Sequence, residues 1–212
     1  MVDNILRQLS WLGHDAFRLQ AAGVTIYFDP FRLAAAPPGA DIILVSHDHY
    51  DHCSPDDIAK IQGPETVIVT EPQAAAKLGG TIKTLAPGAR CEVKGITIEA
   101  VPAYNANKKF HPQGNNWLGF VVTVDGVRIY HAGDTDHIPE MAAMRTDIAL
   151  LPVGGTYTMT AEEAVAAALA IQPQVAIPMH YDTLVGTGDD ADRFAAGLAG
   201  KIRVERLPRV EP

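Results

Sequence analysis

The sequence predicts a layered α/β sandwich, in which two β-sheets lie inside and helices cover them outside. Apolar stretches of strand character recur along the chain and end just before an Asp or a His. Helix-capping patterns stand between these stretches, and one Asp-Gly pair is typical of a hairpin turn. Strands that are paired in hairpins and also alternate with helices fit this architecture.

Four strands are expected to lead into polar residues. Strand ends at one face of a sheet can bring side chains from distant positions into one cleft, while the apolar runs behind them form a rigid support. We therefore expect the chemistry at one edge of the sheets. The strands are expected at residues 24–28, 42–45, 127–130 and 175–177, and the polar residues that follow them are Asp29, His47, Asp134 and His180.

Three helices are expected between the strands. The run Ser54–Asp57 offers an N-cap, a proline at the first helical position and an acid at the third, so a helix should extend to about Gln62. Thr160–Glu163 forms a capping box that opens an alanine-rich helix, which Pro173 closes. The segment 189–200 is expected as the third helix.

A hairpin is expected around residues 125 and 126, the Asp-Gly pair between the strands 117–124 and 127–130. The stretch Ala34–Gly39 is interpreted as a surface loop rather than a linker. An α/β chain of 212 residues usually forms one domain, so residues 1–212 are expected to be a single domain.

The composition, with 47% hydrophobic and 20% charged residues, is that of an ordinary globular protein. No run approaches the roughly 18 apolar residues of a membrane span. The segment Met1–Gln8 lacks the basic and apolar regions of a secretory signal, which predicts a cytoplasmic protein. The two cysteines, Cys53 and Cys91, fit a reducing compartment. Cys53 is interpreted as a small buried side chain, with a metal-ligand role as the alternative.

The expected partner is a small-molecule substrate. The net charge is −8 and no Lys/Arg-rich run occurs, which disfavours nucleic acid because that affinity depends largely on neutralising phosphates. The substrate's identity, the physiological metal and the oligomeric state are left open by the sequence.

The most informative motif is the run His47–His52, which reads HDHYDH and directly follows the apolar residues 42–45. His47 and His49 can bind one cation while Asp51 and His52 turn toward a second, and both ligand types suit zinc. By chance the pattern HxHxDH would occur in roughly one in a thousand chains of this composition. A metal site is therefore favoured over a solvated polar turn.

This motif, together with Asp134 and His180 after later strands, resembles the metallo-β-lactamase-fold hydrolase superfamily over nearly the whole chain. The segments Trp11–His14 and Tyr130–Thr135 look more narrowly like the branch of ascorbate-phosphate lactonases and N-acyl-phosphatidylethanolamine-hydrolysing phospholipase D. The resemblance implies a four-layer αβ/βα sandwich with a dinuclear metal site at the joint edge of its sheets.

The resemblance also implies a ligand set. It places one metal on His47 and His49, the second on Asp51, His52 and His180, and Asp134 between the two. The third imidazole of the first metal is assigned to His111, the only histidine of residues 101–111. The alternatives are another group, a water molecule, or His131, which is expected instead to contact the ligands from behind.

Other side chains are expected to contact ligands or substrate without binding metal. Asp29 is interpreted as an acid that orients an imidazole. His14 is either a structural histidine or one that faces ligands or substrate. The loop 104–109 and the segment 154–159 are the expected substrate contacts, with turn-building as the alternative. In the loop the candidates are Tyr104, Asn105, Asn107 and Lys108, of which the asparagines and the lysine could donate to an anionic group. In the second segment the candidate is Tyr157, which could line the cleft.

The predicted activity is hydrolysis of a small ester, lactone or phosphodiester. Two zinc ions per chain, or manganese or iron, would share a hydroxide as nucleophile, and Asp51 would orient it and carry its proton. The chain contains no GxSxG elbow and no Walker-type phosphate loop, which argues against serine hydrolases and nucleoside triphosphatases. The alternatives are a di-iron redox protein on the same fold and a non-catalytic metal-binding protein.

Overall fold

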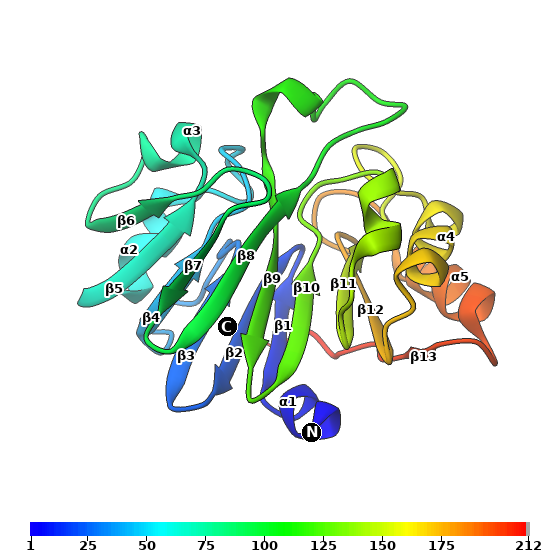
Figure 1. Ribbon diagram of the computed structural model, residues 1–212, viewed down its shortest axis with the longest axis horizontal. Coiled ribbons are helices and arrows are strands. Elements are labelled where there is room, and N and C mark those ends of the chain that lie inside the picture. Colours follow the sequence, from blue (N-terminus) through cyan, green and yellow to red (C-terminus); the bar gives the residue numbers. More distant parts are fainter. Residues whose placement is uncertain (211–212) are drawn as a thin grey trace.

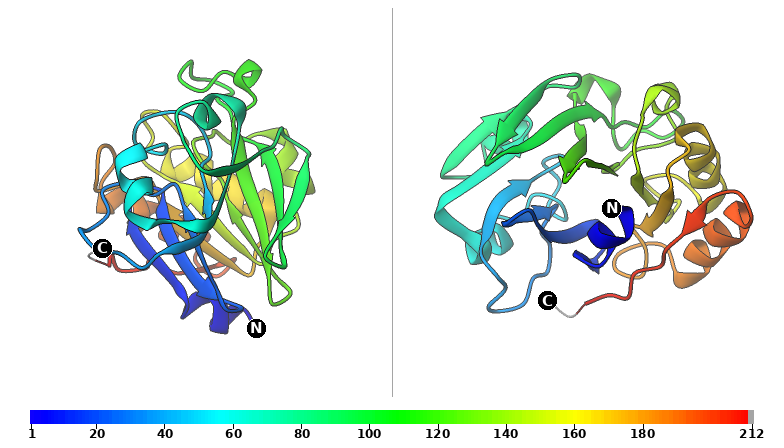
Figure 2. Two further views of the ribbon diagram at one scale, coloured as in Figure 1. Left: turned by 90° about the vertical axis from the view of Figure 1, so that its left-hand side faces the viewer. Right: turned by 60° about the horizontal axis from the view of Figure 1, so that its bottom comes forward.

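The computed structural model, which describes residues 1–210, contains two β-sheets with helices on their outer sides (Figure 1). The six-stranded sheet has the order β1-β2-β3-β4-β5-β6, and the seven-stranded sheet has the order β13-β12-β11-β10-β9-β8-β7. Figure 2 shows from two further sides that α2 lies on the opposite side of the sheets from α4 and α5. The predicted layered sandwich is confirmed.

The strands of the first sheet are β1 (Leu9–Gly13), β2 (Ala16–Ala21), β3 (Val24–Phe28), β4 (Ala40–Leu44), β5 (Gln62–Thr70) and β6 (Thr81–Thr84). Those of the second are β7 (Arg90–Val93), β8 (Ile96–Pro102), β9 (Leu118–Val124), β10 (Val127–His131), β11 (Ile148–Pro152), β12 (Val175–Met179) and β13 (Arg203–Val204). The helices are α1 (Val2–Leu6), α2 (Pro55–Ile61), α3 (Pro72–Ala75), α4 (Ala161–Ile171) and α5 (Gly188–Leu198), with 3-10 turns at Gln113–Asn115 and Pro139–Ala143.

Strand β4 shows how one strand serves two layers. Its side chains alternate between the sheet faces: Ile42 packs in the large core that also contains Phe120 of the second sheet, whereas Ile43 packs in a smaller core with Ile58 of α2. Because both faces are buried, the strand reads as a continuous apolar run. Each such side chain contributes about 1.5–3 kcal/mol to folding.

The predicted helices and hairpin are confirmed. The Ser54 side chain accepts a hydrogen bond from the Asp57 amide at the start of α2, and a capping box at Thr160 opens α4. The third expected segment forms α5. Asp125 and Gly126 have φ values of 50° and 75°, the left-handed conformation of a two-residue hairpin turn.

Strands β3 to β6 run parallel, as do β10 to β13, so the carboxyl ends of each set meet at one edge of their sheet. The predicted polar residues follow these ends, and the turn between β1 and β2 joins them there. Within residues 1–210, no helix combines the length and apolar character needed to cross a membrane.

Candidate metal centre

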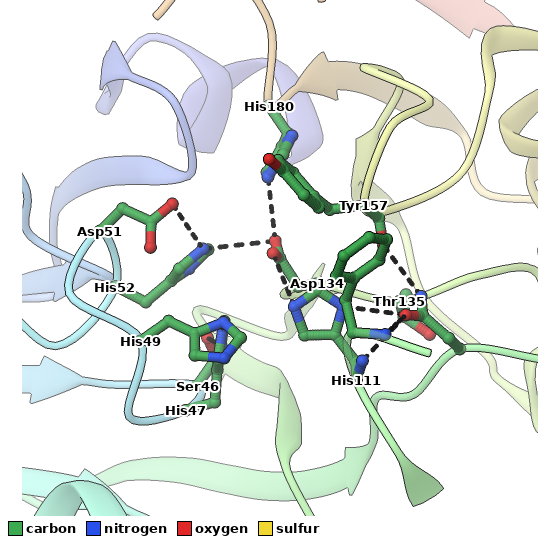
Figure 3. Close-up of polar contacts among 12 residues, drawn as sticks. Ser46, His47, His49, Asp51, His52, His111, Asp134, Thr135, Tyr157 and His180 are labelled. Atoms are coloured by element: carbon green, nitrogen blue, oxygen red, sulfur yellow. Dashed lines mark hydrogen bonds and ion pairs between the residues drawn. The ribbon is translucent and has the colours of Figure 1, made fainter. Parts of the chain in front are cut away.

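All seven side chains predicted as metal ligands come together at the joint edge of the two sheets (Figure 3). They arrive on four separate segments of the chain. The segments are the turn 47–52 after β4, the loop between β8 and β9 with His111, the turn after β10 with Asp134, and the turn after β12 with His180. Their individual roles stay predictions, but their convergence is a property of the structure.

The first group, which we call the three-histidine cluster, consists of His47, His49 and His111. One ring nitrogen of each lies within 4.8 Å of the others, and Nε2 of His47 is 3.0 Å from Nδ1 of His49. Burial lowers the pKa of His47 and of His49, so both imidazoles are neutral near pH 7. Neutral imidazole is the form that binds a metal ion, so this cluster could hold one.

The second group, the carboxylate cluster, consists of Asp15, His52, Asp134 and His180, all of which are buried. Oδ1 of Asp134 lies 3.3 Å from Nε2 of His52 and 3.3 Å from Nε2 of His180. Its other oxygen, Oδ2, lies 3.1 Å from Nε2 of His111. Asp134 therefore faces imidazoles of both clusters, at the centre of Figure 3.

The charges of the carboxylate cluster perturb one another. Burial would raise the pKa of Asp134, but His52 and His180 outweigh burial and hold it well below its usual value. Burial would lower the pKa of His180, yet Asp134 and Asp15 raise it to about 9. Burial also raises the pKa of Asp15 well above its usual value. Such a concentration of perturbed groups is typical of a functional site.

Several buried polar atoms of the two clusters lack a hydrogen-bond partner among the described residues. They include Nε2 of His52, Nε2 of His111, Oδ1 of Asp134 and both side-chain oxygens of Asp15. Leaving a buried polar group unpaired costs about 1–3 kcal/mol, and a metal ion would relieve that cost here. Imidazole nitrogens and carboxylate oxygens suit zinc, manganese and iron, so the residues fit these ions.

Asp29, directly after β3, contacts two of the predicted ligands from behind, one of them through Ser46. Its Oδ2 lies 2.8 Å from Nδ1 of His52 and accepts a hydrogen bond of 2.6 Å from the Ser46 hydroxyl. The same hydroxyl lies 2.9 Å from Nδ1 of His47. A group that holds one imidazole nitrogen fixes which nitrogen is left for a metal. Asp29 is thus placed to orient one imidazole of each cluster.

Asp51 faces a different partner from the one expected. Its Oδ2 lies 3.1 Å from Nε2 of His14 and 3.9 Å from Nε2 of His52. Burial would raise the pKa of Asp51, but the contact with His14 contributes to lowering it to about 2. The groups of side chains around His52 and His180 that could hold a metal ion include Asp15 or His14, and the metal-ligand role of Asp51 stays a prediction.

Asp15 is a member of the carboxylate cluster that the sequence analysis did not propose. It lies in the turn after β1, beside His14, so an acid next to a histidine at a strand end was the available signal. Its backbone carbonyl lies 2.8 Å from Nε2 of His131, whose ring stacks on Phe28. His131 is therefore placed beneath the carboxylate cluster rather than in the three-histidine cluster.

Of the residues expected to contact substrate, only some line the pocket. Tyr157 lines the pocket over the clusters. The Tyr104 hydroxyl donates instead to Glu140, outside the pocket lining. Nζ of Lys108 is 2.7 Å from Asp136 and 3.3 Å from Glu163, and Lys108 is also outside the lining.

Asn105 joins two loops of the site. Its amide nitrogen donates to the Tyr157 carbonyl at 2.9 Å, and its oxygen accepts from the amides of Phe110 and His111 at 3.1 and 2.9 Å. Nδ1 of His111 lies 3.2 Å from the same oxygen. Asn105 thus positions a predicted ligand and a pocket wall, without lining the pocket itself.

Gly133 allows the two sheets to approach closely beside the clusters. Its φ is +61°, and a Cβ there would lie 2.8 Å from the Leu118 carbonyl oxygen and 3.1 Å from Cβ of Ser46. A side chain would be both strained and in collision. The glycine therefore lets the turn that carries Asp134 pack against the end of β4.

Comparison with known proteins identifies the family. The model of the β-lactamase superfamily domain matches residues 8–180. The chain belongs to this superfamily. It is 38% identical, over 210 residues, to a UPF0173 metal-dependent hydrolase of Thermoplasma acidophilum, and the match covers 92% of each protein.

Solved structures agree with this membership. A metal-dependent hydrolase of Parabacteroides distasonis is 33% identical, with a TM-score of 0.85 over 95% of this chain and 92% of that one. A metallo hydrolase of Ignicoccus hospitalis is 25% identical, with a TM-score of 0.77 over 96% and 95%. The protein is thus a metal-dependent hydrolase with the metallo-β-lactamase fold, which confirms the predicted superfamily, fold and enzyme class. The narrower resemblance to the lactonase and phospholipase branch stays a prediction.

Proposed function

We propose that this hydrolase binds two metal ions, one in each cluster, and hydrolyses a small ester, lactone or phosphodiester. The supporting observation is Asp134, whose two oxygens face imidazoles of both clusters. A carboxylate in that position can bridge two cations. Zinc is the proposed ion, and manganese or iron would also suit the donor atoms.

The chain's own residues would prepare the reaction. When bound, two such ions supply a Lewis acid and a water activated at neutral pH. Asp51 lines the pocket and is held by His14, so its carboxylate can accept a hydrogen bond from the attacking water and orient it. A pKa of about 2 keeps Asp51 ionised, and therefore a hydrogen-bond acceptor, at neutral pH.

We further propose that the chain works as one hydrolase domain. The carboxylate cluster takes Asp15 and His52 from turns of the first sheet, and Asp134 and His180 from turns of the second. Neither sheet alone supplies this donor set. Separating the sheets would therefore dismantle the site.

The test is metal content, measured by plasma mass spectrometry on protein purified without chelator. We expect about two ions in the wild type, about one in His111→Ala, and about two in His137→Ala, the control at an exposed histidine. Chelation should abolish hydrolysis of a panel of esters, lactones and phosphodiesters, and zinc or manganese should restore it.

Two results would contradict the proposal. A metal content near zero that neither zinc nor manganese raises would exclude the mechanism. Iron absorption with redox activity and no hydrolysis would favour the di-iron alternative.

A further inference from the structure

The pocket above the two clusters has an apolar outer part. Its volume is about 420 Å³, and five apolar or aromatic side chains line it beyond the polar residues. Seven large hydrophobic side chains are exposed in residues 1–210, and four of them surround this one cavity, which marks a binding surface. The five lining side chains are Tyr50, Phe110, Tyr157, Leu184 and Val185.

Two of these side chains form a wall that is held in place before any ligand arrives. The rings of Phe110 and Tyr157 meet edge to face, with centroids 4.8 Å apart and planes at 90°. Asn105 binds the backbone of both residues. Figure 3 shows the Tyr157 side chain extending toward His180. A wall held in this way loses little conformational entropy on binding.

The pocket also lacks a fixed positive charge. Among the described residues, no lysine or arginine lines it, whereas Asp51 and Asp134 do. Lys108, in the adjacent loop, is bound to Asp136 and Glu163, and only 16% of its side chain is exposed. Metal ions in the clusters could hold one or two phosphoryl oxygens, but the described residues that line the pocket offer no arginine or lysine for the remaining charge, as phosphate sites normally do.

We infer that the pocket takes an uncharged ester or lactone with an alkyl or aryl arm, in preference to a phosphate ester. This inference rests on the proposed function and narrows its substrate class. The carbonyl carbon would face the clusters while the arm lies against Phe110, Tyr157 and Leu184. Hydrolysis joins the oxygen of water to that carbon and breaks the acyl C–O bond. One proton of the water goes to the leaving oxygen and the other is released to solvent, so the products are a carboxylate and an alcohol.

The first experiment compares kcat/KM of the metal-loaded enzyme for γ-lactones of increasing alkyl length. Each methylene that becomes buried should raise kcat/KM by about fourfold, the equivalent of about 0.8 kcal/mol. Phenyl acetate should be hydrolysed at least about tenfold more efficiently than phenyl phosphate or diphenyl phosphate. A flat length dependence, or a preference for either phosphate, would overturn the inference.

Substitutions of the lining residues test whether the pocket causes this dependence on alkyl length. Leu184→Ala and Tyr157→Ala should flatten the dependence on chain length. Leu169→Ala is the matched control, because Leu169 and Leu184 are both 37% exposed and Leu169 lies on α4 outside the pocket. Leu184→Lys should raise kcat/KM for diphenyl phosphate relative to kcat/KM for phenyl acetate. Equal slopes in Leu184→Ala and Leu169→Ala would contradict the role of Leu184 in binding the arm, and an unchanged slope in Tyr157→Ala would contradict the role of the wall.

A binding measurement separates this inference from the proposed function. Total absence of metal-dependent turnover would refute the proposed function alone. Titration calorimetry with alkyl γ-lactams, which mimic the lactones without being readily hydrolysed, then decides the inference. The affinity for the lactams should rise with their chain length in the wild type and in Leu169→Ala, but not in Leu184→Ala. Phenyl phosphate should bind less tightly than the lactams. Length-independent lactam affinity would overturn it.

Discussion

The two clusters lie side by side but are assembled from different distances along the chain. In the three-histidine cluster, His47 and His49 come from one turn and only His111 is remote. The carboxylate cluster takes each residue from a separate turn, namely Asp15, His52, Asp134 and His180. Local sequence therefore produces most of the first cluster, whereas only the packing of both sheets produces the second.

The clusters also differ in charge. The three-histidine cluster offers only imidazoles, and the carboxylate cluster contains two acids. Carboxylates attract a divalent cation electrostatically in addition to donating electron pairs, so we expect the carboxylate cluster to hold its ion more tightly. The comparison predicts that a substitution in one cluster lowers the occupancy of one metal ion. Asp134 and Asp29 are the exceptions, because each contacts residues of both clusters, directly or through Ser46.

The largest expected effect is that of Asp134→Ala. Because this carboxylate faces both clusters, its loss should weaken the binding of both metal ions and lower kcat/KM by about 1,000-fold or more. Metal content and kinetics would be measured together, with circular dichroism to verify folding. Retention of both ions at wild-type affinity would show that the clusters are independent.

A smaller effect is expected for Asp15→Asn, which changes the carboxylate cluster alone. The affinity of one ion should fall by roughly 100-fold, with the other unchanged, because the amide keeps the shape but removes the charge. Competition with a fluorescent chelator would measure the two constants separately. If both constants fell equally, the proposed separation between the clusters would be wrong.

Asp29→Asn should lower the affinity for each of the two metal ions by about tenfold, because Asp29 contacts His52 directly and His47 through Ser46. The same chelator competition applies. Ser46→Ala provides a sharper comparison, because it should affect the three-histidine cluster more than the carboxylate cluster. A loss confined to one ion in Asp29→Asn would exclude the shared support.

The smallest effect on the metals is expected for Asp57→Asn, within the helix that follows the metal turn. The amides of Arg32 and Leu33 donate to the Asp57 carboxylate at 2.8 and 2.9 Å, and Lys60 lies 2.8 Å away. Removing the carboxylate's charge should lower the free energy of unfolding by about 1–3 kcal/mol and leave the metal content unchanged. Chemical denaturation would measure it, with the exposed Asp56→Asn as control.

This loss of stability should depend on pH. Burial would raise the pKa of Asp57, but its hydrogen bonds outweigh burial and lower the pKa below 3.8. A depressed pKa in the folded state contributes stability above the unfolded value, and that contribution is lost as the pH falls through the folded pKa. The difference between wild type and Asp57→Asn should therefore be full at pH 6 and shrink below about pH 3.8. A constant difference would exclude this account.

Sequence reasoning succeeded where local signals are strong. The caps at Ser54 and Thr160 and the Asp125-Gly126 turn depend on a few neighbouring residues, and the structure contains them. The expected strands account for β3, β4, β9, β10 and β12, and the other eight strands of residues 1–210 were not assigned. One of the eight, β11, is fully buried but does not lead into an Asp or a His, whereas β6 and β7 lack a strong local signal. They lie at the edges of their sheets and are largely exposed, so they lack the apolar run that marks a buried strand.

The sequence by itself determined the fold class and the metal chemistry, because capping, turn conformation and histidine spacing are properties of short segments. Only the tertiary structure decided that Asp15 joins His52, that Asp51 faces His14, and that Lys108 is held away from the pocket. These outcomes, and the apolar wall of the pocket, depend on how closely turns from two sheets approach. That approach is set by the packing of the core and by a glycine at position 133, which no local pattern encodes.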